Sequence, residues 1–296
     1  MIETPKQPNL RDASTGTATA SPNEAEVLFE DVWLGFEQNQ VLKGLSFGVA
    51  EGETKVLVGE GGTGKTLAMK LAAGLLQPDA GRIRVLGREV TSMSELELLD
   101  FRKNIGFVFQ EGALFDSMTV AENVSFRLRE ESVDEAQIDA RTREVLHFVE
   151  MEHSIEKYPS ELSGGMRRRV SIARALVDRP SIVFYDSPTA GLDPVTSQTI
   201  ITLVLRGRDL QGVTSLLATH RVQDAFGLAR FSFDESTGRV VPRNGHSHAA
   251  GEPYARETAE TNVIVLKGGR IYYEGAANDM LKTTDSYLQQ YLASAE

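Results

Sequence analysis

The chain has 296 residues, of which 41% are hydrophobic and 25% charged, a composition typical of a globular protein with one large core or two small ones. Its formal net charge of −11 argues against nucleic acid as a main partner, because phosphate backbones attract basic surfaces. It contains no cysteine, which excludes disulfides and zinc–thiolate sites, and no run of 18 or more apolar residues, so we expect no membrane-spanning helix.

The N-terminal 25 residues are rich in Ser, Thr, Ala, Pro and Asn, and we expect them to form a flexible tail. They lack a basic segment followed by an apolar stretch, so no secretory signal is predicted. Strands are predicted at 27–36, 41–42 and 45–49, as a small antiparallel layer. Phe36 or Trp33 in this layer can stack on an adenine ring, or both can simply pack in the sheet.

The segment from Gly59 to Thr66 has the spacing G-x-x-x-x-G-K-[ST] of a phosphate-binding loop, the P-loop. It lies between a predicted strand at 54–58 and a predicted helix at 67–73, which is the context that this loop requires. Its glycines let backbone N–H groups turn toward a polyphosphate, and the N-terminus of the helix adds its positive end. The candidate ATP-binding residues of the loop are Gly59, Glu60, Gly61, Gly62, Thr63, Gly64, Lys65 and Thr66. Lys65 would contact the β- and γ-phosphates, and the Thr66 hydroxyl would bind Mg²⁺.

A strand at 82–87 and a short acidic helix at 94–102, capped by Ser94, are predicted after the P-loop helix. The next apolar strand, at 105–109, ends at Gln110. Open α/β sheets bind ligands at the carboxyl ends of their strands, so Gln110 is a candidate contact for Mg²⁺ or for the attacking water.

Residues 118–160 change character, because apolar residues recur at helical spacing through 120–129 and 133–151. This pattern predicts a helical subdomain inserted between two strands. Ser163, Gly164 and Gly165 follow and begin a predicted helix that runs through Leu176. Its open N–H groups offer a second anion site, although a glycine-containing cap without a ligand is the alternative.

The apolar strand at 180–186 ends in Asp186, which fits the second signature of P-loop proteins, an aspartate that holds Mg²⁺. A helix is predicted at 195–210 and a further strand at 213–219, after which His220 could meet the γ-phosphate. From 234 to 260 the pattern dissolves, and we predict an exposed insertion. Two histidines in it, His246 and His248, fit solvated side chains better than metal ligands. A hairpin at 262–275 and a helix from Ala277 onward are predicted to complete the chain.

These motifs, in this order, resemble the ABC transporter ATPase family over residues 27 to 290. The resemblance rests on the P-loop, on Gln110 as the glutamine loop, on the signature-like segment 162–166, and on Asp186. The segment 191–193, with Asp193, resembles the D-loop of the family, His220 its switch histidine, and Phe36 its adenine-stacking aromatic.

The fold implied is α/β: a P-loop NTPase of ABC type, with a mostly parallel core sheet, an antiparallel β-subdomain and an inserted helical subdomain. The nucleotide-binding domain would span 26–283, with the helical subdomain at about 112–172 and the insertion at about 234–260. Residues 1–25 and 284–296 would be an N-terminal tail and a C-terminal helical tail.

The resemblance also implies ATP and Mg²⁺ as cofactors, with Thr66, Gln110 and Asp186 around the metal. It implies a homodimer in which Ser163, Gly164 and Gly165 of one copy contact the ATP of the other. The catalytic candidates are His220, Gln110, Asp193 and the residue at position 187.

A narrower likeness is carried by the segments 109–120 and 162–166, which look like the ATPases of Mla-type, MCE-associated phospholipid transporters. This branch implies a peripheral ATPase at the cytoplasmic face of the inner membrane. Its implied partners are a membrane permease pair and an MCE-type lipid-binding protein, without nucleic acid.

Two positions depart from the family. Ser187 stands where the family places the glutamate that acts as general base, and general-base help is worth about 10²–10⁴-fold in rate. Three readings remain open: hydrolysis is slow, His220 and Gln110 suffice, or another carboxylate reaches in. Glu60 replaces a neutral P-loop residue and should repel phosphates unless its side chain points away. The chain is therefore expected to be a transport-coupled ATPase, or alternatively an ATP-binding regulatory module with very slow hydrolysis.

Overall fold

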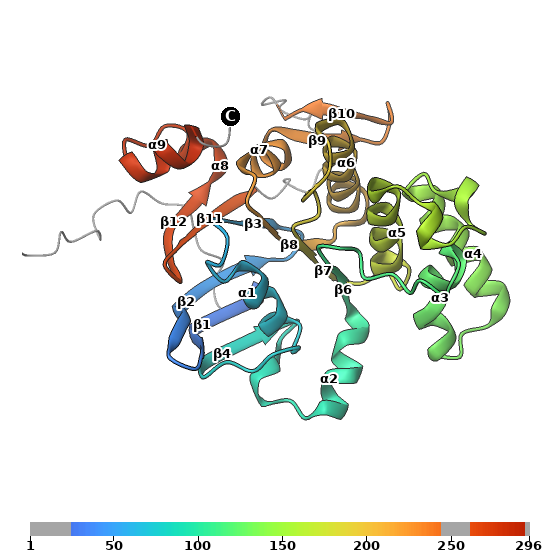
Figure 1. The fold of residues 1–296 in the computed structure, drawn as a ribbon, viewed down its shortest axis with the longest axis horizontal. Coiled ribbons are helices and arrows are strands. Elements are labelled where there is room, and N and C mark those ends of the chain that lie inside the picture. Colours follow the sequence, from blue (N-terminus) through green and yellow to red (C-terminus); the bar gives the residue numbers. More distant parts are fainter. Residues whose placement is uncertain (1–24, 244–260, 294–296) are drawn as a thin grey trace, which may run out of the picture.

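The computed structural model describes residues 25–243 and 261–293 (Figure 1). The strands are β1 (Ala25–Phe36), β2 (Asn39–Ala50), β3 (Thr54–Val58), β4 (Ala80–Val85), β5 (Arg88–Glu89), β6 (Ile105–Val108), β7 (Ile182–Asp186), β8 (Thr214–Thr219), β9 (Phe231–Asp234), β10 (Arg239–Pro242), β11 (Asn262–Lys267) and β12 (Arg270–Ala276). The α-helices are α1 (Lys65–Ala72), α2 (Glu95–Phe101), α3 (Val120–Glu130), α4 (Glu135–Phe148), α5 (Gly164–Leu176), α6 (Pro194–Gln211), α7 (Val222–Arg230), α8 (Ala277–Met280) and α9 (Ser286–Ala293). Short 3₁₀ helices lie at Val90–Ser92, Arg102–Asn104, Glu152–Ser154 and Pro159–Glu161.

The central sheet has the strand order β12-β11-β3-β8-β7-β6. Its strands from β11 to β6 run parallel, and only β12 is antiparallel to its neighbour β11. Parallel sheets are covered on both faces, and β3, β7 and β8 are accordingly buried at every residue. The expected mostly parallel α/β core is confirmed.

Two hydrophobic cores lie on the two faces of this sheet. Alternate residues of a strand point to opposite faces, and β3 accordingly sends Val56 and Val58 into one core and Leu57 into the other. The first core also holds side chains from α3, α4, α5, α6 and α7. The second holds α1, α2 and the strands β1, β2 and β4, which Figure 1 draws below the central sheet.

A second, antiparallel sheet forms the expected β-subdomain, in the order β2-β1-β4-β5. Strand β2 is continuous from Asn39 to Ala50, where the sequence had suggested two short strands, because it pairs with β1 along most of its length. Phe29 and Phe47 lie opposite each other in this pair, and their rings stack at 4.5 Å. Cross-strand aromatic pairs of this kind fix the register of a sheet.

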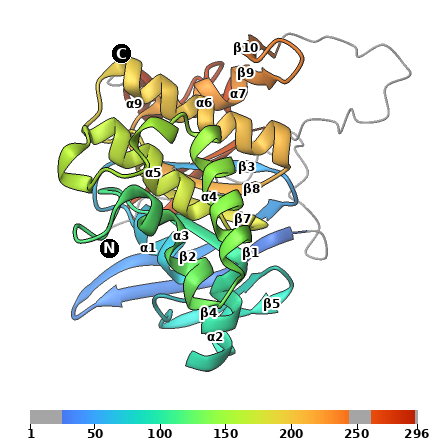
Figure 2. The ribbon, with the colours of Figure 1, turned by 90° about the vertical axis from the view of Figure 1, so that its right-hand side faces the viewer.

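The inserted helical subdomain is made by α3, α4 and the first part of α5, and it faces the viewer in Figure 2. Each helix starts at a side-chain cap: Thr119 with Glu122 in a capping box, Asp134 through the Ala136 N–H, and Ser163 through the Met166 N–H. The predicted helix at 133–151 is shorter in the structure, because Asp134 caps it and it ends at Phe148. The predicted Ser94 cap of α2 is confirmed, with Glu97 completing a capping box.

Some regular structure was not expected. Strands β9 and β10 form a hairpin that overlaps the start of the predicted insertion at 234–260, and α7 fills a stretch for which no element was predicted. The predicted C-terminal helix is interrupted between α8 and α9. The predicted tail at 1–25, apart from Ala25, the rest of the insertion, and both His246 and His248 lie outside the described residues.

Candidate functional site

The predicted site residues from four strands meet at one edge of the central sheet. Parallel registers bring Val58 beside Thr219, Asp186 beside Ala218, and Val108 beside Tyr185. Gly59, Ser187 and His220 each follow one of these strand ends by one residue, and Gln110 follows its strand by two. This edge is the carboxyl end of the sheet, where open α/β folds bind ligands.

The P-loop keeps its path because two of its glycines sit where no side chain fits. A Cβ on Gly59 would lie 2.5 Å from the carbonyl oxygen of Leu266, and one on Gly64 would collide with Leu42 of β2. Gly62 and Gly64 have φ of +76° and +98°, which glycine adopts without strain. A Cβ on Gly61 or Gly62, by contrast, would meet nothing within 4 Å. The loop is therefore packed tightly at its two ends and open in its middle.

The Lys65 ammonium group sits inside this loop, with the side chain largely buried. Its Nζ donates to the carbonyl oxygens of Gly59 at 2.7 Å and Glu60 at 2.8 Å. Burial lowers the pKa of Lys65, and the nearby carboxylates of Asp186 and Glu60 oppose that shift. A buried ammonium group surrounded by loop carbonyls is well placed to form an ion pair with a phosphate.

Thr66 and Asp186 are 120 residues apart in sequence and meet at the site. The Thr66 hydroxyl donates to Asp186 Oδ1 at 2.9 Å. Burial raises the pKa of the Asp186 carboxyl, and the hydrogen bond from Thr66 opposes this. Hydroxyl and carboxylate oxygens are ligands that Mg²⁺ prefers, so the pair of Thr66 and Asp186 fits the ion. Gln110 offers an amide oxygen from the segment after β6, the strand that pairs with β7.

Ser187 lies at the end of β7, 9% exposed, with its N–H donating to Ala218 O at 2.8 Å. Its φ is +46°, in the left-handed region that non-glycine residues rarely adopt. Backbone strain of this kind concentrates at functional sites. The structure thus places Ser187 directly after Asp186, at the position where the family would have the glutamate that acts as general base.

Three of the predicted motifs share one cavity of about 470 Å³. Gln110 and Glu111 line it from the segment after β6, Gly164 from the start of α5, and Gly191 from the segment between β7 and α6. Ser163 caps α5, and both Ser163 and Gly164 are exposed. The start of α5 is therefore open to solvent at Ser163 and Gly164.

His220 and Asp193 complete the predicted set. His220 is exposed at the end of β8, next to the P-loop strand. Asp193 caps α6, because its carboxylate accepts from the Thr196 N–H at 3.0 Å and the Thr196 hydroxyl at 2.5 Å. The capping role of Asp193 is a structural one that the sequence analysis did not foresee.

Two further residues hold the motifs together and were not predicted. Arg168 of α5 is 6% exposed and donates to Phe109 O at 2.7 Å, tying the signature helix to the segment that carries Gln110. Burial lowers the pKa of Arg168, while Asp186 and Glu111 oppose the shift. Asp224 is 3% exposed and accepts from Thr189 at 2.6 Å and Thr219 at 2.7 Å, which joins the loop after Asp186 to the end of β8. The sequence shows a charged residue at each of these two positions, but it could not predict the roles of Arg168 and Asp224, because their hydrogen-bond partners are distant in sequence.

The choice between Phe36 and Trp33 as the stacking aromatic is narrowed by their surroundings. The Trp33 indole N–H donates to Asp31 at 2.9 Å, and the Arg270 guanidinium lies 5.6 Å from its ring. Phe36 is 49% exposed, at the turn of the β1–β2 hairpin whose second strand packs against Gly64. Phe36 is therefore the more exposed of the two candidate aromatics.

We expect Phe36→Ala to weaken ATP binding about fivefold, since an aromatic stack is worth about 1 kcal/mol. Equilibrium titration of the purified chain with ATP measures this, with Leu96→Ala on α2 as the control, because Leu96 is 80% exposed. Equal ATP affinities for the two variants would contradict a role of Phe36 in ATP binding.

Gly165 is predicted to be required for the packing of α5. A Cβ there would collide with Cγ2 of Thr196, and Thr196 cannot rotate without losing its hydroxyl bond to Asp193. We expect Gly165→Ala to lower the free energy of unfolding by about 1–3 kcal/mol. Gly164→Ala is the matched control, because its Cβ would meet Leu192 at an ordinary 3.5 Å. Urea denaturation compares them, and an equal free energy of unfolding for both would contradict this packing.

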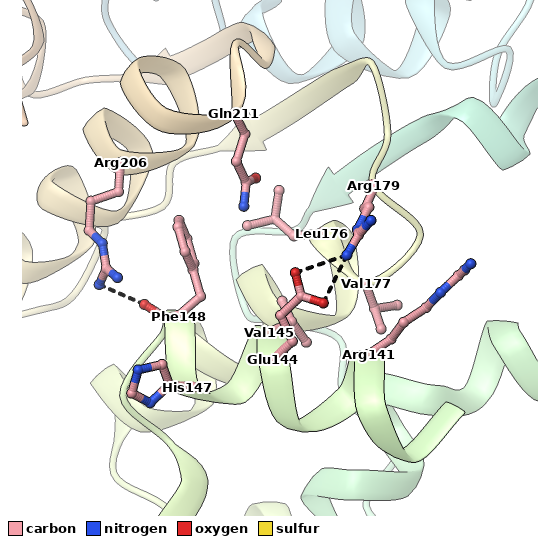
Figure 3. Close-up of a pocket in the computed structure, with 10 residues that line it drawn as sticks. All are labelled: Arg141, Glu144, Val145, His147, Phe148, Leu176, Val177, Arg179, Arg206 and Gln211. Carbon is pink, nitrogen blue, oxygen red and sulfur yellow. Dashed lines mark hydrogen bonds and ion pairs between the residues drawn. The ribbon is translucent and has the colours of Figure 1, made fainter. Parts of the chain in front are cut away.

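A second cavity, of about 210 Å³, lies away from these motifs between α4, the end of α5, and α6 (Figure 3). Phe148 and Gln211 point into it, whereas Arg141 and His147 point away from its centre. Its other cations are engaged: Arg179 pairs with Glu144 at 2.9 Å, and Arg206 donates to Phe148 O at 2.7 Å. The cavity therefore presents no cluster of free charges, and we assign it no function.

Within 25–243 and 261–293, no group of three or more His, Asp or Glu side chains is arranged to hold a metal ion. In the same part of the chain, no helix has both the length and the apolar character needed to cross a membrane.

Comparison with known sequences gives a family match and several relatives. Residues 42–190 match the model of the family described as ABC transporter. The chain is 33% identical over 284 residues to the chloroplastic protein TRIGALACTOSYLDIACYLGLYCEROL 3 of Arabidopsis thaliana, covering 91% of this chain and 74% of that relative. It is 36% identical over 222 residues to the methionine import ATP-binding protein MetN of Rhizobium johnstonii, covering 75% of this chain but only 61% of that relative.

Solved structures agree with the fold. The protein cbiO1 from Clostridium perfringens, described as part of the ABC transporter complex cbiONQ, matches at a TM-score of 0.72 and 25% identity over 91% of this chain and 95% of that one. A dimeric ATP-binding cassette bound to ADP and Pi matches at a TM-score of 0.70 and 25% identity, over 85% of this chain and 98% of that one.

Proposed function

This chain belongs to the ABC transporter family as an ABC-type ATPase, and from that premise we propose that it powers phospholipid traffic between membranes. The proposal rests mainly on the share of this chain that aligns with one lipid-related relative. The relative whose name contains that of a glycolipid, trigalactosyldiacylglycerol, matches 91% of this chain, whereas the methionine importer matches 75%. The relative's name supports a lipid cargo, and the segments 109–120 and 162–166, which resemble the ATPases of Mla-type phospholipid transporters, support a phospholipid as that lipid.

We infer that two copies form the working unit, with each ATP held between them. The P-loop of one copy would face Ser163, Gly164 and Gly165 of the other, whose exposed helix start is suited to the γ-phosphate. The similarity to a dimeric cassette bound to ADP and Pi supports this arrangement. Binding of ATP would favour the closed dimer and hydrolysis the open one, a switch limited by the differential affinity of ATP for the two states.

The proposed partners are a membrane permease pair and an MCE-type lipid-binding protein, with the ATPase peripheral at the cytoplasmic face of the inner membrane. The similarity to cbiO1, part of a transporter complex, supports a permease partner. The net charge of −11 supports the absence of nucleic acid.

Each site residue receives a role from its position. Lys65 would neutralise the β- and γ-phosphates, and the open Gly61–Gly62 backbone would approach them closely. Thr66, Gln110 and Asp186 would hold Mg²⁺, which when bound neutralises phosphate charge. His220 and Gln110 would orient the attacking water near the γ-phosphate, and Asp193 would fix the start of α6 beside the signature.

Ser187 favours a second candidate function. A hydroxyl cannot take a proton at neutral pH as a carboxylate can, so hydrolysis would be slow and ATP binding alone could switch a partner. Single-turnover hydrolysis by the purified complex distinguishes the two candidates. Turnover within the time of a transport cycle supports the ATPase, and ATP that stays intact on the complex supports the regulatory module.

Isolation of the chain from its host membrane tests the cargo and the partners together. We expect a multi-span permease and a lipid-binding MCE protein to co-purify, with phospholipid bound. Recovery with a permease and a methionine-binding protein instead would contradict the phospholipid proposal and leave the ATPase assignment intact.

A further inference from the structure

One buried carboxylate, that of Asp224 in α7, lies between two segments of the nucleotide site. Its Oδ2 accepts from the Thr189 hydroxyl at 2.6 Å and from the Thr219 hydroxyl at 2.7 Å. Thr189 belongs to the loop that follows Asp186, and Thr219 is the last residue of β8. Both threonines are as fully buried as the carboxylate. A single carboxylate oxygen therefore joins two segments that are far apart in sequence.

The turn that carries His220 is anchored on both sides by the same carboxylate. His220 itself is exposed, but its two chain neighbours are held in place. The Thr219 hydroxyl, besides donating to Asp224, accepts from the Arg221 N–H at 3.0 Å and so closes the turn across the histidine. The Arg221 Nε lies 3.8 Å from Asp224 Oδ1, and the same guanidinium donates to the Ser197 hydroxyl at 2.8 Å. Asp224 thus contacts the residue before His220 and the residue after it.

The loop 187–193 is held to this turn at two places. Thr189 binds Asp224 within the loop, and Ser197, near the start of α6, binds Arg221 just beyond it. Burying a carboxylate costs free energy unless hydrogen bonds and an opposite charge compensate it. Here those partners come from the two segments that carry candidate catalytic residues. The network therefore fixes one of these segments relative to the other.

We propose that Asp224 is a positioning residue of the ATPase: it holds the turn of His220 against the loop 187–193, and so sets where the histidine meets the attacking water. Loss of the bond between Asp224 and the loop lets the two segments shift, and a shift of about 1 Å in a reacting group can cost about 10²-fold in rate. ATP affinity is expected to stay, because the P-loop that binds the phosphates follows another strand, β3. The inference rests on the role proposed above for His220 and not on the cargo.

The test is the single-turnover rate of ATP hydrolysis by the full-length chain, in its purified complex, carrying Thr189→Val. Valine has the shape of threonine without the hydroxyl, so the variant loses one bond to Asp224, and its thermal unfolding is recorded alongside. We expect a rate about tenfold lower than that of the parent, with ATP affinity within about twofold. Thr189→Ser, which keeps the hydroxyl, is expected to restore the rate to within about twofold.

Thr142→Val in α4 is the matched control. Thr142 is also buried, and in the described part of the chain its hydroxyl has no hydrogen-bond partner. The same substitution there removes a buried hydroxyl without touching the network, so we expect the parent rate. A serine variant at position 189 that is as slow as the valine variant, or a control that slows equally, would mean that the lost bond is not the cause.

Thr189→Val is then made in a chain that carries His220→Ala. If Asp224 acts through the histidine, the substitution now lowers the rate by less than about twofold, since no histidine is left to misplace. A loss of about tenfold in both backgrounds, or no loss in the parent, overturns the inference. The role of His220 is judged separately, because it fails only if His220→Ala alone leaves the rate unchanged, and the inference then fails with it. Thr219→Val, which removes the other hydroxyl bond to Asp224, decides between the same outcomes if Thr189→Val does not fold.

Discussion

Replacing Lys65 with alanine is expected to weaken ATP binding by at least about 100-fold. The Lys65 ammonium is buried among loop carbonyls, and a bound phosphate would replace them with charge-assisted hydrogen bonds. Two such bonds at about 1.5 kcal/mol each amount to about 3 kcal/mol, and each 1.4 kcal/mol is a factor of ten in affinity. Alanine also leaves the carbonyls of Gly59 and Glu60 without their donor, so the loop loses its internal support.

Lys103→Ala is the matched control, because Lys103 is an exposed lysine in the 3₁₀ helix Arg102–Asn104. Calorimetric titration with Mg²⁺ and ATP gives both affinities. Binding by the Lys65 variant that matches the Lys103 variant would mean that the nucleotide is held elsewhere.

Ser187→Glu is expected to raise the steady-state rate of ATP hydrolysis, by up to about 10²–10⁴-fold. The substitution restores a carboxylate at the end of β7, beside Asp186, where it can take a proton from the attacking water. Ser187→Gln is the control, because glutamine has the same shape and no basic oxygen. Any residue at this position carries the strain of φ +46°, so strain affects both variants alike.

Equal hydrolysis rates for the Glu and Gln variants would contradict the idea that position 187 limits the reaction. Another carboxylate would then be doing the work of the base. Glu111 is the candidate to test next, because it lines the same cavity as Gln110.

The nucleotide site could be predicted from the sequence where local pattern and topology agree. A glycine loop between a strand and a helix, and an aspartate at the end of another apolar strand, meet because parallel strands share one carboxyl edge. Thr66 and Asp186 accordingly lie in hydrogen-bond contact across 120 residues of sequence. Ser163 could be predicted as a cap because the capping rule needs only a few adjacent residues.

Other features depend on tertiary contacts that no local pattern encodes. Strands β9 and β10 have four residues each, and the hairpin is anchored from α6, where Asp209 accepts from the Phe233 N–H at 2.7 Å and Arg208 donates to Phe231 O at 3.0 Å. The polar residues around this hairpin favour a loop when they are judged from the sequence alone.

A structure of the chain trapped with Mg²⁺ and a non-hydrolysable ATP analogue tests most directly whether each ATP is shared between two copies. We expect a dimer in which Ser163 of one copy lies within about 3 Å of a γ-phosphate oxygen held by Lys65 of the other. An analogue bound by the P-loop of a single copy, with both Ser163 side chains remote from it, would contradict the account.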